Sequence, residues 1–187
     1  MADAQDEIDY RKFYDANIES YLLTEVAKRF HEFGEVTPFD FYLILHWKAP
    51  RSKNRTKERL HRATNGGFAC AVKQITEALY CPSQPAKDRL KLLMEDWGFR
   101  LPTATAILTV LWPEEFTVYD RRVCDTLGDF HYLGARHFSD DLWRDYLSFK
   151  QGVIDEKPCD LSLRDKDRYL WGKSFFEQAQ NDCRDCP

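Results

Sequence analysis

Residues 97–123 read WGFRLPTATAILTVLWPEEFTVYDRRV, and this stretch decides which fold the chain is expected to adopt. A turn that contains Gly98 follows a helix predicted to end at Asp96, since glycine adopts positive φ at low cost. A second helix, rich in small residues, is predicted to begin near Pro102, because proline suits the first turn of a helix. Asp120 stands immediately before a third helix. The stretch therefore predicts a helical hairpin followed, after a short connection, by a carboxylate at a helix start.

Helix signals dominate on both sides of this stretch, and there is little of the alternation typical of strands. The helices are predicted at about residues 6–33, 38–48, 68–80, 84–96, 121–132, 139–154 and 163–180. Thr37, Ser83 and Ser139 are the expected N-caps, because their hydroxyls accept bonds from backbone amides of the first turn. The run at 41–45 is apolar on all sides, so its helix is expected to be central.

The length and composition fit one domain with a core of its own. The chain has 187 residues, of which 43% are apolar and 14% aromatic, enough to build a core without disulfides or metal. We therefore predict a single all-α domain over residues 1–187. It has room for two helical lobes, with the hairpin and the aspartate at 96–123.

Location, membrane and cofactor expectations come from what the sequence lacks. It has no apolar run of the roughly 18 residues that a membrane span needs, and its acidic first residues do not resemble a signal peptide. A cytoplasmic protein with no membrane partner is expected. Cys183 and Cys186 form a lone C-x-x-C pair, whereas a zinc site needs four ligands. The spacing from Cys159 to Cys183 does not fit an iron–sulfur loop, so we expect no metal, no cofactor and an inert tail.

Charge is unevenly distributed along the chain. The net charge of −4 argues against a uniformly basic nucleic-acid binder. Residues 48–62 nevertheless contain seven Lys/Arg and a single acid, Glu58, which gives this segment a charge of +6. The basic residues are Lys48, Arg51, Lys53, Arg55, Lys57, Arg59 and Arg62. The segment is either a solvated surface or a contact for a polyanion, most simply phosphates.

The hairpin around Gly98 and the aspartate that follows Val118 and Tyr119 resemble the helix-hairpin-helix DNA glycosylase superfamily. The resemblance is strongest over 85–130 and extends more loosely to Trp47 and Lys48 and to 164–171. It is closest to an uncharacterised bacterial branch, for which it implies a fold and no established reaction. The implied fold is an all-α, helix-hairpin-helix glycosylase-like bundle.

The resemblance also implies a function and a set of site residues. A monofunctional base-excision glycosylase would hydrolyse the N-glycosidic bond of a modified base in duplex DNA, with Asp120 as its catalytic carboxylate. The expected nucleic-acid contacts are Gly98, Arg100, Thr103, Lys48, Arg51, Lys53 and Arg55. The base pocket is expected at Trp47, Tyr42 and Tyr119. Their aromatic rings, and not their spacing, are the reason, since a flipped base needs aromatic surfaces.

Two departures from the family pattern affect the predicted phosphate contact and the predicted reaction. The family hairpin reads L-P-G-x-G, whereas only Gly98 stands in the corresponding place here, which restricts how near a phosphate can come to the backbone. Members that also cleave the strand carry a lysine nucleophile near the start of the next helix. That position is Pro102 or Thr103 in this chain, so no lyase activity is expected.

Alternatives remain at the level of sequence. Asp120 can be a helix cap alone, which contributes about 1 kcal/mol, and the chain can be a non-catalytic module that binds nucleic acid or a protein partner. The histidines show no metallohydrolase spacing, and no P-loop, G-x-G-x-x-G or G-x-S-x-G is present. Segment 164–171 is expected to be a helix whose Trp171 packs in the core and whose charges pair in solvent.

Overall fold

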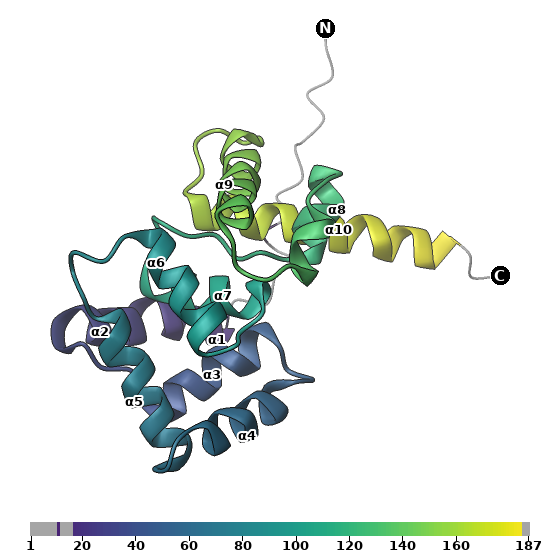
Figure 1. The fold of residues 1–187 in the computed structure, drawn as a ribbon. Helices are drawn as coiled ribbons and strands as arrows, with labels where there is room; N and C mark the ends of the chain where they lie inside the picture. The colour runs from purple at the N-terminus through teal and green to yellow at the C-terminus, as the bar shows by residue number, and fades with distance from the viewer. Residues whose placement is uncertain (1–10, 12–16, 185–187) are drawn as a thin grey trace, which may run out of the picture.

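The computed structural model describes Arg11 and residues 17–184, and all regular elements within these residues are helical (Figure 1). In chain order they are α1 (Asn17–Tyr21), η2 (Leu22–Val26), α2 (Ala27–Phe33), α3 (Pro38–Lys48), α4 (Lys53–Ala63), α5 (Gly67–Leu79), α6 (Ala86–Lys91), η3 (Leu92–Asp96), α7 (Leu101–Leu111), α8 (Arg121–Leu127), η4 (His131–Ala135), α9 (Asp140–Asp155) and α10 (Leu163–Arg184). The all-α prediction is confirmed. None of the helices in the described part is both long and apolar enough to cross a membrane.

The first helices follow the local signals of the sequence. α1, the π-helical η2 and α2 form one continuous helix, which ends at Gly34 in the left-handed region with φ 67°. The part of this helix predicted before residue 17 lies outside the described residues, apart from Arg11. Thr37 caps α3 as expected, because its hydroxyl accepts the Asp40 amide at 3.1 Å.

Two expectations in the next segment were wrong or incomplete. Most of the basic stretch forms a helix of its own, α4, which packs along α5 and buries only Leu60. Leu60 is the single large apolar residue of α4, so no row of apolar positions marked this segment as a helix. Ser83 does not cap a helix, since α6 begins after Pro85, whose fixed φ sets the start without a side-chain cap.

The predicted hairpin is present between η3 and α7. Gly98 adopts φ 62°, and the Phe99 amide closes the turn on the Leu93 carbonyl at 2.9 Å. α7 is buried along nearly its whole length, so it occupies the centre of the molecule. The small side chains of Ala104 and Ala106 let neighbouring helices approach it.

Helices α8, α9 and α10 form a second group, which lies apart from α1–α7 in Figure 1. α8 is shorter than predicted, because Gly128 terminates it in the left-handed region with φ 71°. Ser139 caps α9 as expected, by accepting the Leu142 amide at 3.1 Å. α10 packs along α8 and α9, and its final turns project past α8.

One apolar core joins the two groups. Leu22 and Phe30 of the first group belong to the same buried cluster as Tyr146, Phe149 and Leu170 of the second. Core packing therefore holds the two groups of helices in a fixed relative position.

Candidate functional site

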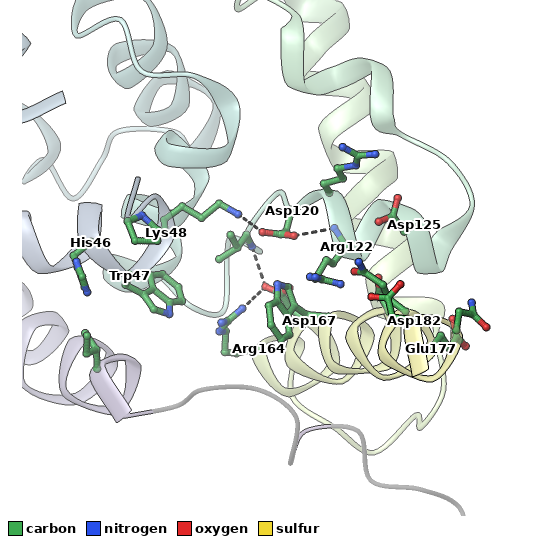
Figure 2. Close-up of a pocket in the computed structure, with 18 residues that line it drawn as sticks. His46, Trp47, Lys48, Asp120, Arg122, Asp125, Arg164, Asp167, Glu177 and Asp182 are labelled. Atoms are coloured by element: carbon green, nitrogen blue, oxygen red, sulfur yellow. Dashed lines mark hydrogen bonds and ion pairs between the residues drawn. The ribbon is translucent and has the colours of Figure 1, made fainter. Parts of the chain in front are cut away.

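A groove of 1120 Å³ lies between the two groups of helices, and Asp120 stands near its middle (Figure 2). Its walls come from the end of α3, the start of α8 and one side of α10. Figure 2 shows its lining residues spread from His46 and Trp47 at one end to Glu177 and Asp182 at the other. The groove is therefore elongated, and the predicted catalytic aspartate faces it.

Asp120 is held by two donors from different elements. The Lys48 ammonium at the end of α3 lies 2.5 Å from Oδ2, and the Arg122 amide donates to Oδ1 at 2.8 Å. The side chains of Lys48 and Asp120 are 10% and 25% exposed, so this ion pair is largely shielded from solvent. Burial by itself would raise the pKa of the Asp120 carboxyl, but the charge and hydrogen bond of Lys48 and the Arg122 amide outweigh it. The pKa is lowered, and the carboxylate is ionised.

The segment that carries Asp120 is extended, and side chains from three helices hold its backbone. The Thr117 amide donates to the Tyr146 hydroxyl at 3.1 Å, and that hydroxyl donates back to the Thr117 carbonyl at 2.8 Å. The next two amides, at 118 and 119, donate to Asp167 at 3.1 Å and to Thr105 at 2.9 Å. Three successive amides thus end on α9, α10 and α7, which fixes where the carboxylate of residue 120 points.

A buried ion network lies directly beneath this segment. Arg164 donates to both Glu19 and Asp167, and Asp167 is only 2% exposed. The expectation that the charges of 164–171 pair in solvent was wrong for Arg164 and Asp167, which are buried and paired with each other and, through Arg164, with the buried Glu19. Burial raises the pKa of Asp167 in spite of the opposing influence of Arg164 and the Val118 amide. The Arg164 guanidinium also lies 5.2 Å from the centre of the Trp47 ring.

Of the three residues expected in a base pocket, the structure brings only Trp47 to the groove. The Tyr42 hydroxyl bonds Asn54 at 2.8 Å, outside the groove. The Tyr119 hydroxyl donates to the Phe130 carbonyl at 2.8 Å, on the opposite side of its segment. Side chains alternate along an extended backbone, so a residue next to a groove-facing Asp120 must face away.

Comparison with protein-family models found no match, and comparisons with curated proteins and with solved structures likewise found no similar protein. No family is therefore assigned to the chain. The resemblance to helix-hairpin-helix glycosylases remains a prediction from the residues of the hairpin and of the aspartate segment.

The predicted nucleic-acid contacts fall into three places. Lys48 lies in the groove, whereas Arg51, Lys53 and Arg55 surround the start of α4. Gly98, Arg100 and Thr103 remain at the hairpin, where Arg100 donates to the Ala135 carbonyl at 3.1 Å. The structure does not bring these three sets together into one contact.

Arg59 of α4 contacts the hairpin, which its place in the basic segment did not predict. Its guanidinium donates to the Trp97 carbonyl at 2.5 Å and lies 5.2 Å from the centre of the Phe99 ring. A Cβ on Gly98 would stand 3.2 Å from Arg59 Nη1. Burial lowers the pKa of Arg59. Arg59 therefore joins α4 to the hairpin by a local contact.

A second feature that the sequence did not predict is a pair of stacked aromatic rings on α10, Trp171 and Phe175, which we call the aromatic shelf. The rings of Trp171 and Phe175 are stacked at 5.7 Å with 9° between their planes. The Arg122 guanidinium lies 5.2 Å and 5.4 Å from the two ring centres. The i, i+4 spacing of the two aromatic residues on a helix was the available signal.

Within the described residues, no group of three or more His, Cys, Asp or Glu is arranged to hold a metal ion. Cys183 is exposed on the last turn of α10, and Cys186, its partner in the C-x-x-C pair, lies outside the described residues. The groups that line the groove are carboxylates, the Lys48 amine, guanidinium groups, the His46 imidazole, indole rings, and the hydroxyl and amide groups of Ser174, Gln178 and Asn181.

Proposed function

We propose that the protein binds DNA and cleaves the N-glycosidic bond of a modified nucleotide, with Asp120 as the catalytic carboxylate. The observation that carries this proposal is an ionised carboxylate, fixed by Lys48 and by the Arg122 amide, in a groove with indole rings in its walls. A flipped base is bound by such aromatic surfaces and by a few polar groups.

The chemistry requires one negative charge beside the sugar. As the bond between C1′ and the base nitrogen breaks, the base keeps the bonding pair and positive charge develops on the sugar. A preorganised carboxylate stabilises that charge and orients the water that adds to C1′. The proton that this water loses balances the charge of the departing base. The lowered pKa of Asp120 keeps the group in the form that this role needs.

The position of the Lys48 amine bears on whether the protein cleaves the DNA strand. The expected absence of lyase activity rested on Pro102 and Thr103, which have no amine. The structure brings the Lys48 amine to the same carboxylate from α3, so that expectation no longer follows from the residues. Trapping with borohydride separates the two reactions, since only an amine–sugar imine is reduced to a stable adduct.

The surface beside the groove supports binding of a polyanion. Arg51 and Arg55 are exposed at the start of α4, whose first turn contains no acid and whose Ser52 makes no side-chain cap. Cations at a helix N-terminus are unfavourable by about 0.3–1 kcal/mol each. Stability of the isolated chain does not explain this arrangement, whereas phosphates would neutralise it.

The test is single-turnover base release from duplexes that carry different modified bases. Asp120→Asn is the informative variant, because asparagine caps helices as well as aspartate does and α8 keeps its start. Asp141→Asn, which removes an exposed carboxylate of α9 that does not line the groove, is the matched control. Release that is lost in Asp120→Asn and retained in Asp141→Asn is the expected result. Release that is indifferent to Asp120 would contradict the assignment.

A second candidate function is DNA binding without chemistry. It is favoured by the departure of the hairpin from the family pattern, since a single glycine stands there with Arg59 beside it. Salt-dependent binding of wild type together with no base release from any duplex would select this alternative. Lys48→Met then shows whether DNA binds in the groove or at α4, because this substitution alters the groove and leaves α4 unchanged.

A further inference from the structure

The groove is much longer than a pocket for one nucleotide. One face of α10 lines it, with residues spaced three or four apart: Arg164, Asp167, Trp171, Ser174, Gln178 and Asn181. Such spacing places side chains in a single row along a helix. With a rise of 1.5 Å per residue, the row from 164 to 181 extends over about 26 Å.

The volume of the groove lies just above the range for a single ligand, in agreement with its length. Sites for a single drug-sized ligand, which is also the size of one nucleotide, have volumes of roughly 300–1000 Å³. The groove has 1120 Å³ and continues past Asp120 toward the end of α10. A flipped nucleotide at Asp120 would therefore leave the part beyond Trp171 empty.

The groove has two aromatic stations, each beside a guanidinium. Trp47 lies beside Arg164 at one end, and Trp171 lies beside Arg122 on the other side of Asp120. Phe175 does not line the groove, but its ring stacks on that of Trp171. Stacking on aromatic rings and on arginine planes is the means by which proteins hold unpaired bases, because every base has a π-face. Bases paired within a duplex do not offer that face.

We infer that the groove binds an unpaired stretch of DNA several nucleotides long, which runs along α10 and stacks on Trp171. The inference rests on the proposed function for the identity of the polymer and deepens it, since it names the form of DNA that the site accepts. At about 3.4 Å per stacked nucleotide, the row on α10 corresponds to about eight nucleotides.

The acidic residues at the far end define how the strand lies. Asp125, Glu177 and Asp182 line the groove beyond the shelf. Carboxylates repel phosphates but accept hydrogen bonds from the exocyclic amines of cytosine and adenine. The strand therefore presents its base edges to this part of the groove and its phosphates to solvent.

The first experiment measures affinity against length. Fluorescein-labelled single-stranded deoxycytidine oligonucleotides of 2 to 14 nucleotides are titrated with the full chain and followed by anisotropy at fixed salt. Kd is expected to fall with length and to level off near eight nucleotides. A duplex of the plateau length, containing no modified base, is expected to bind at least tenfold more weakly than the single strand.

The second experiment removes the shelf. Trp171→Leu keeps an apolar side chain against its neighbours and removes the stacking surface, so binding of the plateau-length strand is expected to weaken by about 5- to 100-fold. Trp171→Phe retains a ring and is expected to recover most of the affinity. Phe39→Leu, at an aromatic residue that is 66% exposed and does not line the groove, is the matched control and is expected to bind like wild type.

The outcomes separate this inference from the proposed function. Length-dependent binding that Trp171→Leu weakens, in a protein that releases no base, supports the unpaired-strand site and contradicts the catalytic role of Asp120. Base release together with a Kd that is independent of length, or equal for single strand and duplex, overturns the inference alone. If Trp171→Leu fails to fold, Trp171→Phe and the length series still decide it.

Discussion

Replacing Lys48 by methionine should remove the ion pair that holds the Asp120 carboxylate. Methionine retains most of the volume of the lysine chain and removes the charge. The carboxylate then keeps only the Arg122 amide as a donor among the contacts described above. Because burial is no longer opposed by the neighbouring ammonium, the pKa of Asp120 is expected to rise.

The expected loss of stability follows from how deeply the pair lies. Exposed ion pairs contribute about 0.2–1 kcal/mol, whereas loss of one partner from a fully buried pair costs about 3–5 kcal/mol. Lys48 and Asp120 are 10% and 25% exposed, which lies between these cases. We therefore expect a coupling free energy of about 2 kcal/mol at pH 7 between the two side chains.

A double-mutant cycle measures this coupling. Urea unfolding of wild type, Lys48→Met, Asp120→Asn and the double variant is compared at pH 7 and again at lower pH. Since the pKa of Asp120 is lowered in the folded state, its contribution is complete above the ordinary aspartate pKa, about 3.9. It is lost as the pH falls through the folded-state pKa. A coupling below about 0.5 kcal/mol at pH 7, within the error of additivity, would refute the reasoning.

Three further perturbations test the framework around the site, each by urea unfolding. Gly98→Ala is expected to be more destabilising than Gly128→Ala: both glycines have positive φ, but only the first would bring a Cβ against a guanidinium, at 3.2 Å. Equal losses would mean that this contact is not formed. Tyr119→Phe should lower the free energy of unfolding by about 1–3 kcal/mol, because backbone groups of the 130–134 turn lose their partner. Base release should stay unchanged. A loss of activity without a loss of stability would place the Tyr119 hydroxyl in the reaction. Asp167→Asn should cost about 3 kcal/mol, since it leaves a buried guanidinium with one carboxylate fewer, and a cost under 1 kcal/mol would argue against the buried pair.

Local signals in the sequence were sufficient for the parts of the fold that local chemistry decides. Thr37, Asp120 and Ser139 cap helices as their side chains predict, and Gly98 adopts the positive φ of the hairpin. Each of these depends on residues within a few positions along the chain. The basic helix α4 was missed because Leu60 is its single large apolar residue, so no row of apolar positions marked the segment as a helix.

The content of the site could not be predicted in the same way. Lys48 and Asp120 are 72 positions apart, and Glu19 and Arg164 are 145 apart. Such contacts are decided by how helices pack, and a single sequence carries no record of them. The position of Tyr119 is different, since alternation along the segment that carries Asp120 was enough to direct it away from the groove.

The two carboxylates beside this segment show why Asp120, and not Asp167, is the better candidate for chemistry. Both lie in the groove wall, yet their pKa values are displaced in opposite directions. Asp167 is almost fully buried, and its Oδ2 already accepts the Val118 amide and Arg164. Asp120 is partly open to the groove and ionised. Asp167 thus positions the segment, whereas Asp120 has both the charge and the access that stabilising a sugar cation requires.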